Sequence, residues 1–122
     1  MEIESLINEI ISFPEKFLRL GNISIYPFLK DIGYFKDYDQ VQEDNIAKAL
    51  IQQPEYINTW FGWSEDKRVT SGWYIQDKED GNFLVGYFPK NDEHPQVLYT
   101  NITNACAGFI KREIEDVRIR IH

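Results

Sequence analysis

Nucleophiles and metal ligands are sparse in this sequence. Its histidines are His94 and His122, and neither belongs to an HxxxH or HxH spacing that sets two ligands on one face. His94 could join Asp92 and Glu93 around a metal ion, but a solvated loop explains this polar segment better. Cys106 lies on the apolar face of a predicted helix, which indicates a buried structural thiol. We therefore expect no metal site, no cofactor and no catalytic residues.

The densest run of chemistry-bearing side chains is residues 64–68, which read Ser-Glu-Asp-Lys-Arg directly after an aromatic cluster. The carboxylates of Glu65 and Asp66 could do acid–base chemistry if a cleft raised the pKa of one of them. The sequence supplies no oxyanion site, phosphate cradle or second catalytic cluster, so we expect no enzymatic activity. The alternatives are an ordered turn with local ion pairs and a partner-binding loop anchored by exposed edges of Trp63 and Trp73. Trp63, Glu65 and Asp66 are therefore candidate partner-binding residues.

Acidic side chains outnumber basic ones, with 20 Asp plus Glu against 13 Lys plus Arg and a formal net charge of -7. This charge opposes binding to nucleic acid and to an anionic membrane, because both reward clustered Lys and Arg. It favours a basic protein partner, whose association clustered carboxylates accelerate, although a charge run is also typical of solvated surface. The acids predicted to bind the partner are Asp77, Glu79, Asp80, Asp92 and Glu93. A second dense patch comprises Asp37, Asp39, Glu43 and Asp44.

The elements that must position these residues begin with helices. Residues 2–12 carry apolar side chains at the spacing of one helix face, and a second short helix over 14–20 ends at Gly21 as its C-cap. Residues 22–38 are mixed, because residues 23–25 alternate as in a short strand while later apolar positions keep helical spacing.

A third helix is predicted over residues 40–53, after a capping box at residues 39–42. Residues 56–61 indicate one more helical turn, which leads into a polar turn at residues 64–67. The aromatic side chains of this segment, Trp63 among them, are expected to lie mostly in the core.

In the second half the apolar period changes from 3.6 to 2. Residues 73–77 and 83–88 alternate as the strands of a hairpin, and residues 97–99 supply a third strand. Residues 101–117 return to helical spacing. The predicted fold class is therefore α+β, with N-terminal helices, an antiparallel meander of three or more strands, and a C-terminal helix packed on one sheet face.

Length and composition predict one domain over residues 1–122, present as a monomer. A single Cys excludes an internal disulfide, and the acidic N-terminus is unlike the basic start of a secretory signal. Apolar runs are far shorter than the ~20 residues that cross a bilayer. We therefore expect a soluble, cytoplasmic protein.

Three motifs resemble those of a known class of proteins: Trp-Ser-Glu-Asp-Lys-Arg at residues 63–68, Gly-Trp-Tyr at 72–74 and Gly-Tyr-Phe at 86–88. Across residues 60–118 the chain resembles small bacterial immunity proteins of contact-dependent inhibition and polymorphic toxin systems. The resemblance implies a cytoplasmic protein without enzymatic activity, which neutralises one cognate toxin domain, often a nuclease, that forms part of a large secreted protein.

Two further classes of function stay open. A small enzyme or ligand-binding domain would use an aromatic pocket around Trp60, Trp63, Trp73 and Tyr74. An adaptor would bind some other protein. The leading hypothesis is an immunity protein that binds a basic toxin domain, as a monomer in a 1:1 complex, through its acidic surface.

Overall fold

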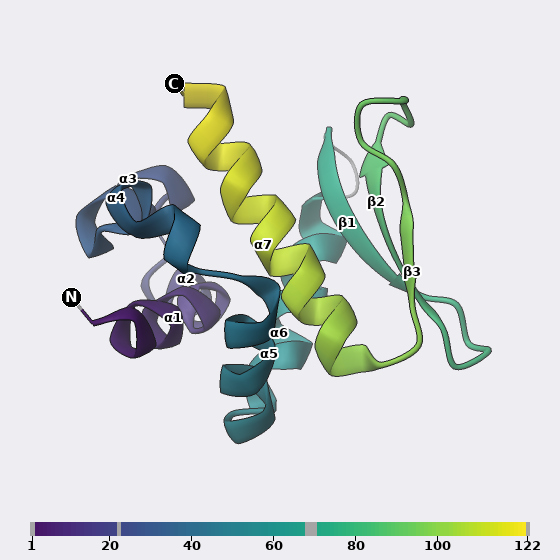
Figure 1. Ribbon diagram of the computed structural model, residues 1–122, viewed down its shortest axis with the longest axis horizontal. Helices are drawn as coiled ribbons and strands as arrows, with labels where there is room; N and C mark the ends of the chain where they lie inside the picture. The colour runs from purple at the N-terminus through teal and green to yellow at the C-terminus, as the bar shows by residue number, and fades with distance from the viewer. Residues whose placement is uncertain (1, 22, 68–70, 122) are drawn as a thin grey trace.

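The computed structural model describes residues 2–21, 23–67 and 71–121, without the side chains of residues 66, 67 and 121. The elements follow one another as α1 (Ile3–Ile11), α2 (Phe13–Leu20), α3 (Ile25–Ile32), α4 (Tyr34–Asp37), the 3-10 turn η1 (Tyr38–Gln40), α5 (Glu43–Gln52), α6 (Glu55–Lys67), β1 (Gly72–Asp77), β2 (Phe83–Phe88), β3 (Val97–Tyr99) and α7 (Ile102–Ile121). Helices and an antiparallel sheet occupy separate parts of the chain, which confirms the predicted α+β class. In Figure 1, α7 crosses the molecule between the N-terminal helices and the sheet.

The first two helices agree with their predicted spacing. Pro14 lies in the first turn of α2, where its missing N–H leaves no helical hydrogen bond unmade. Gly21 ends α2 in the left-handed conformation, with φ 76°, and its N–H donates to the Phe17 carbonyl at 2.8 Å. One face of α1 lies in the core: Leu6, Ile7, Ile10 and Ile11.

Of the two patterns in the mixed segment, the strand-like alternation at residues 23–25 does not form a strand, because Ile25 begins the helix α3. Pro27 lies in the first turn of α3, where proline is tolerated, and helical spacing continues to Ile32. Gly33, with φ 91°, then separates α3 from α4. Two alternating isoleucines are too short a signal to outweigh this longer helical pattern.

The predicted capping box at residues 39–42 is also wrong. Residues 38–40 form η1, and Val41 is extended and fully buried, so α5 begins only at Glu43. The Gln42 N–H donates to Asn45 Oδ1 at 3.2 Å, which places the cap three residues further along the chain.

Residues 55–67 form one continuous helix, α6, where one helical turn and a polar turn were predicted. Ser64 is fully buried inside this helix, and its Oγ accepts a hydrogen bond from the Ile75 N–H at 2.8 Å. Trp60 is also fully buried, and its indole N–H donates to the Ile11 carbonyl at 2.9 Å. Polar residues near the end of α6 indicated a turn, but contacts of Trp60 with α1 and of Ser64 with β1 hold the segment as a helix.

The strands form the predicted antiparallel meander in the order β1-β2-β3. Trp73 faces Tyr87 across the first pair, and Val85 faces Val97 across the second. This register places odd-numbered side chains of β1 and β2 on the face that α7 covers.

α7 packs on one face of the sheet and against α5, as predicted for the C-terminal helix. Cys106 is fully buried there, which confirms its structural position, and burial raises the pKa of its thiol. Tyr99 approaches Gly108 so closely that a Cβ at Gly108 would overlap the phenol, so this position requires glycine. None of the described helices combines the length and the apolar character that a membrane crossing requires.

Candidate partner-binding surface

The two faces of the sheet have different surroundings. Toward α7 and α6 the side chains of Trp73, Ile75 and Val85 are buried. On the opposite face Phe88 is 52% exposed and Leu98 is 58% exposed. Figure 1 shows the helices on one side of the sheet and none on the other. We call the apolar side chains of the uncovered face the outer apolar strip: Tyr74, Leu84, Phe88 and Leu98.

The register of the strands joins these side chains into one strip. Leu84 lies directly opposite Leu98, and Tyr74 lies opposite Gly86. A Cβ on Gly86 would come within 2.7 Å of the Tyr74 hydroxyl, so the Tyr74 side chain lies across the neighbouring strand. Apolar side chains therefore adjoin on all three strands.

The five predicted partner-binding acids of the meander fall into two groups at opposite ends of the sheet. Glu79 and Asp80 lie on the β1–β2 connection, whereas Asp77, predicted on the same loop, is the last residue of β1; we name these three the turn acids. Asp92 and Glu93, the loop acids, lie on the β2–β3 connection. Successive connections of an antiparallel meander lie at opposite ends, as Figure 1 shows. The acids therefore flank the sheet and do not form one patch.

Local hydrogen bonds, each between residues two positions apart, fix the backbone of the turn acids. Asp77 Oδ1 accepts from the Glu79 N–H at 2.8 Å, and Asp80 Oδ1 accepts from the Asn82 N–H at 3.0 Å. Glu79 adopts the left-handed conformation, with φ 64°. The turn acids are thus held in place by their own loop.

The loop acids are ordered in the same way, because Asn91 Oδ1 accepts from the N–H groups of Glu93 and His94, each at 3.0 Å. All five acids are exposed. None of them forms an ion pair with a cation among the residues that the structure describes. Lys78 and Lys90 lie on the same connections, but each end keeps an excess of negative charge.

The second acidic patch is partly neutralised. Glu43 accepts a hydrogen bond from the Tyr99 hydroxyl at 2.9 Å and lies 3.6 Å from the Arg112 guanidinium. Asp39 and Asp44 are exposed, and Asp37 is half-buried. This patch therefore combines a structural contact with ordinary surface.

Trp63 and Glu65 lie on α6 rather than on a loop, and the structure does not place them with the acids of the meander. Both line a groove of about 350 Å³ between α2 and α6, together with Leu18. The Trp63 indole N–H donates to Glu113 Oε2 at 2.8 Å, and its ring meets Phe13 edge-on at 5.3 Å. The side chain of Asp66 lies outside the described residues.

The predicted exposed edge of Trp73 is wrong. Trp73 is buried beneath α7, where the Arg112 guanidinium lies 5.6 Å from its ring centroid. Tyr87 meets it edge-on at 5.4 Å. Trp73 and Tyr74 point to opposite faces of β1, and Trp60 fills the core, so these side chains do not share one aromatic pocket.

His94 belongs to this aromatic packing and is less solvated than the sequence suggested. Its ring stacks on Tyr87 at 3.9 Å and meets Trp73 edge-on at 5.5 Å. Its Nδ1 lies 2.8 Å from Asn91 Oδ1. Among the described residues, no group of three or more His, Cys, Asp or Glu side chains is placed to hold a metal ion.

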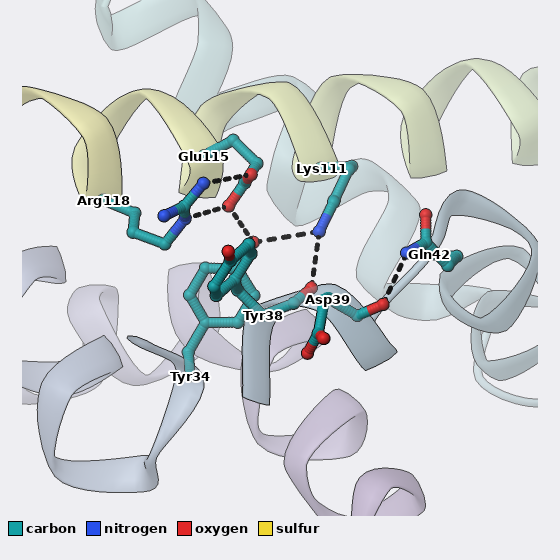
Figure 2. Close-up of polar contacts among 7 residues, drawn as sticks. All are labelled: Tyr34, Tyr38, Asp39, Gln42, Lys111, Glu115 and Arg118. Carbon is teal, nitrogen blue, oxygen red and sulfur yellow. Dashed lines mark hydrogen bonds and ion pairs between the residues drawn. The ribbon is translucent and has the colours of Figure 1, made fainter. Parts of the chain in front are cut away.

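A polar cluster that the sequence analysis missed joins α4 and η1 to α7 (Figure 2). The Tyr34 hydroxyl donates to Glu115 Oε2 at 2.6 Å, and Arg118 donates to both Glu115 oxygens at 2.7 and 2.9 Å. Lys111 Nζ donates to the Tyr34 hydroxyl at 3.1 Å and to the Tyr38 carbonyl at 3.0 Å. We call these five residues the α7 cluster.

Charge and burial oppose each other in the α7 cluster. Burial raises the pKa of Tyr34 far above its usual range, and the adjacent Glu115 adds to this shift. Burial alone would raise the pKa of Glu115, but hydrogen bonds from Arg118 and Tyr34 and the charge of Lys111 outweigh it. The pKa of Glu115 therefore lies below its usual value, and this carboxylate is ionised at neutral pH.

Two signals for these sites were present in the sequence. Alternation of Leu84, Gly86 and Phe88 defines one face of a strand, but alternation does not reveal which face a helix covers. Glu115 lies four residues after Lys111 and three residues before Arg118, which is the spacing of one helix face, but their partner Tyr34 is distant in sequence.

Comparisons of the chain with protein-family models, with curated proteins and with solved structures found no match.

Proposed function

We propose that this protein is a cytoplasmic immunity protein, without enzymatic activity, that binds a basic toxin domain and neutralises it. The observation that carries the proposal is the state of the turn acids and the loop acids. All five carboxylates are exposed, and none pairs with a cation in the part of the chain that the structure describes. Their mutual repulsion is relieved when a basic surface covers them.

Two acids of α7 are neutralised by neighbouring cations. Glu115 pairs with Arg118 at 2.7 Å, and Asp116 pairs with Arg120 at 3.2 Å. The turn acids and the loop acids differ from these, although their backbones are just as well ordered. Ordered but uncompensated charge supports a role in docking, because it attracts an oppositely charged partner and orients the encounter.

The chemistry of the proposed partner follows from the same charges. A toxin domain that cleaves RNA or DNA must neutralise phosphates with Lys and Arg in its cleft. An acidic inhibitor uses those same cations, so the net charge of -7 matches this class of toxin. The complex is proposed to contain one copy of each protein, without nucleic acid or membrane.

A small apolar ligand in the α2–α6 groove is a second candidate. Leu18 at its rim is 71% exposed, and no atom lies within 4 Å of a Cβ built on Gly62 in its wall. The change Gly62→Leu would place a side chain in the groove. Saturable binding of a small apolar ligand that is lost in this variant would support this candidate over the immunity function.

The immunity function predicts that a gene beside this chain's own gene encodes a toxin domain, and its test is co-expression with that domain. We expect the native protein to restore growth. A variant with Glu79→Lys, Asp80→Lys and Asp92→Lys should protect less, because it reverses charge at both ends of the sheet. Exposed substitutions such as Glu79→Lys and Asp92→Lys usually change stability by less than about 0.5 kcal/mol each. Asp80→Lys also removes the oxygen that accepts the Asn82 N–H, so circular dichroism checks that this variant keeps its fold.

The matched control reverses three exposed acids elsewhere: Glu4→Lys, Asp31→Lys and Glu55→Lys. It has the same net charge as the test variant, so a general charge effect would lower protection equally in both. Equal rescue by the native protein and the test variant would remove the turn acids and the loop acids from the interface. Absence of rescue by the native protein would contradict the immunity function.

A further inference from the structure

The outer apolar strip lies on a rigid support. Leu84 and Leu98 are direct cross-strand neighbours, and β2 lies between two hydrogen-bonded strands. Single exposed apolar side chains are ordinary on a protein surface, whereas a contiguous set on one sheet face marks a binding surface. Phe88 and Leu98 are each more than half exposed, so they are available to a partner without any change of fold.

Negative charge lies at both ends of this strip. β1 and β2 each contain six residues. At ~3.4 Å per residue, a strand of this length spans about 20 Å, so the turn acids and the loop acids lie about that far apart. A surface that covers the whole face therefore meets carboxylates, then apolar side chains, then carboxylates.

We propose that the outer apolar strip is the centre of the interface with the basic toxin domain. The partner covers the strip with apolar side chains, and these lie between two groups of Lys or Arg about 20 Å apart. The inference rests on the proposed function and assigns it a contact surface. Phe88 and Leu98, toward opposite ends of the strip, are its most exposed contacts, and the turn acids and the loop acids form the charged rim.

A second copy of this chain is a poor occupant of the same surface. Two sheets that pack face to face keep their strands within about 30° of each other. Because both ends of the face are acidic, either direction of such packing brings carboxylates against carboxylates. A partner with Lys and Arg at its rim replaces this repulsion between carboxylates with attraction.

The size of the sheet supports the same arrangement. β1 and β2, each about 20 Å long, and the three-residue β3, about 10 Å long, lie about 4.8 Å apart and present a face of roughly 240 Å². A stable complex buries about 800 Å² on each partner, so the strip alone is too small. The interface must extend beyond the sheet, and the connections that carry the acids are its immediate surroundings.

The experiment measures binding of the purified protein to the purified toxin domain that the proposed function predicts beside its gene. We expect Leu98→Ser and Phe88→Ser each to raise Kd more than tenfold, mainly through faster dissociation, with an unchanged dependence on salt. Glu79→Gln with Asp80→Asn should instead slow association and weaken the salt dependence. Ile51→Ser, at a 67% exposed position of α5 outside the sheet, is the control and should leave Kd unchanged.

Each outcome decides between the claims. A native protein that binds while Leu98→Ser and Phe88→Ser retain its Kd would overturn the strip as the interface and leave the immunity function standing. A native protein that does not bind would overturn both. Self-association of the native protein that Leu98→Ser abolishes, measured by sedimentation, would assign the strip to a second copy. Near-ultraviolet circular dichroism and a Leu98→Ala variant separate lost contact from lost fold.

Discussion

Glu115 in the α7 cluster and Glu79 at the β1–β2 connection are both ordered acids, but their surroundings differ. Glu115 receives hydrogen bonds from Tyr34 and Arg118, and the ammonium group of Lys111 lies nearby. Glu79 is exposed and has no ion pair among the described residues. The helical side of α7 therefore uses charge to hold elements together, and the sheet side leaves charge available to a partner.

Apolar side chains follow the same division. On the inner side of the sheet Trp73 and Val85 are buried by helices, whereas Phe88 and Leu98 on the outer side are not. If the proposed function holds, stability and recognition are assigned to different sides of α7. Changes to the α7 cluster should alter unfolding, and changes to the outer side of the sheet should alter binding.

The largest effect on stability is expected from Glu115→Ala. The substitution leaves Arg118 and Lys111 without their carboxylate and removes the acceptor of the buried Tyr34 hydroxyl. We expect a loss of about 2 kcal/mol of unfolding free energy, since such a change strands partly buried polar groups. Urea denaturation measures the unfolding free energy, and a loss below about 0.5 kcal/mol would show that the α7 cluster does not stabilise the fold.

A smaller effect is expected from pH. The pKa of Glu115 is lowered in the folded state, so its contribution is present above the unfolded pKa and is lost as pH falls through the folded value. The native protein should therefore lose more stability than Glu115→Gln between neutral pH and about pH 3. Denaturation midpoints of both proteins measure this difference. Parallel loss in the two proteins would mean that other groups carry all of the acid sensitivity.

The smallest effect is expected from neutralising the turn acids. Asp77→Asn, Glu79→Gln and Asp80→Asn together keep the side-chain oxygens that accept the turn hydrogen bonds. We expect the unfolding free energy to stay within about 0.5 kcal/mol of the native value or to rise as repulsion is relieved. A loss similar to that of Glu115→Ala, in the same urea assay, would remove the contrast between the two sides of α7.

The fold class could be predicted because long periodic segments dominate it. The apolar faces of α1 and α7 and the alternation in β1 and β2 extend over enough residues to define their period. The wrong predictions of secondary structure lie where the sequence pattern is short or where a contact distant in sequence decides the conformation. Residues 23–25 alternate, but Ile25 already begins α3, and the polar residue Ser64 continues α6 because it bonds to β1.

The candidate site was predicted only in part. Turn composition placed Glu79, Asp80, Asp92 and Glu93 correctly on the two connections of the meander, because Asp, Asn and Gly favour such backbones, whereas Asp77 ends β1. Their separation follows from topology, and the uncovered face of the sheet depends on where α7 packs. Neither can be read from local residue types. Trp63 and Glu65 were misplaced because α6 continues past them.

The contact between Ser64 and Ile75 has a consequence for aggregation. Ser64 Oγ accepts the Ile75 N–H at 2.8 Å, and its hydroxyl lies 3.4 Å from the Ile75 carbonyl, so α6 occupies the free edge of β1. A strand from another molecule cannot pair at Ile75, in the middle of this edge, because both backbone groups of this residue are already engaged. The opposite edge, β3, is only three residues long. The sheet can thus expose apolar side chains on one face while its edges offer few free backbone groups for the strand pairing that forms a fibril.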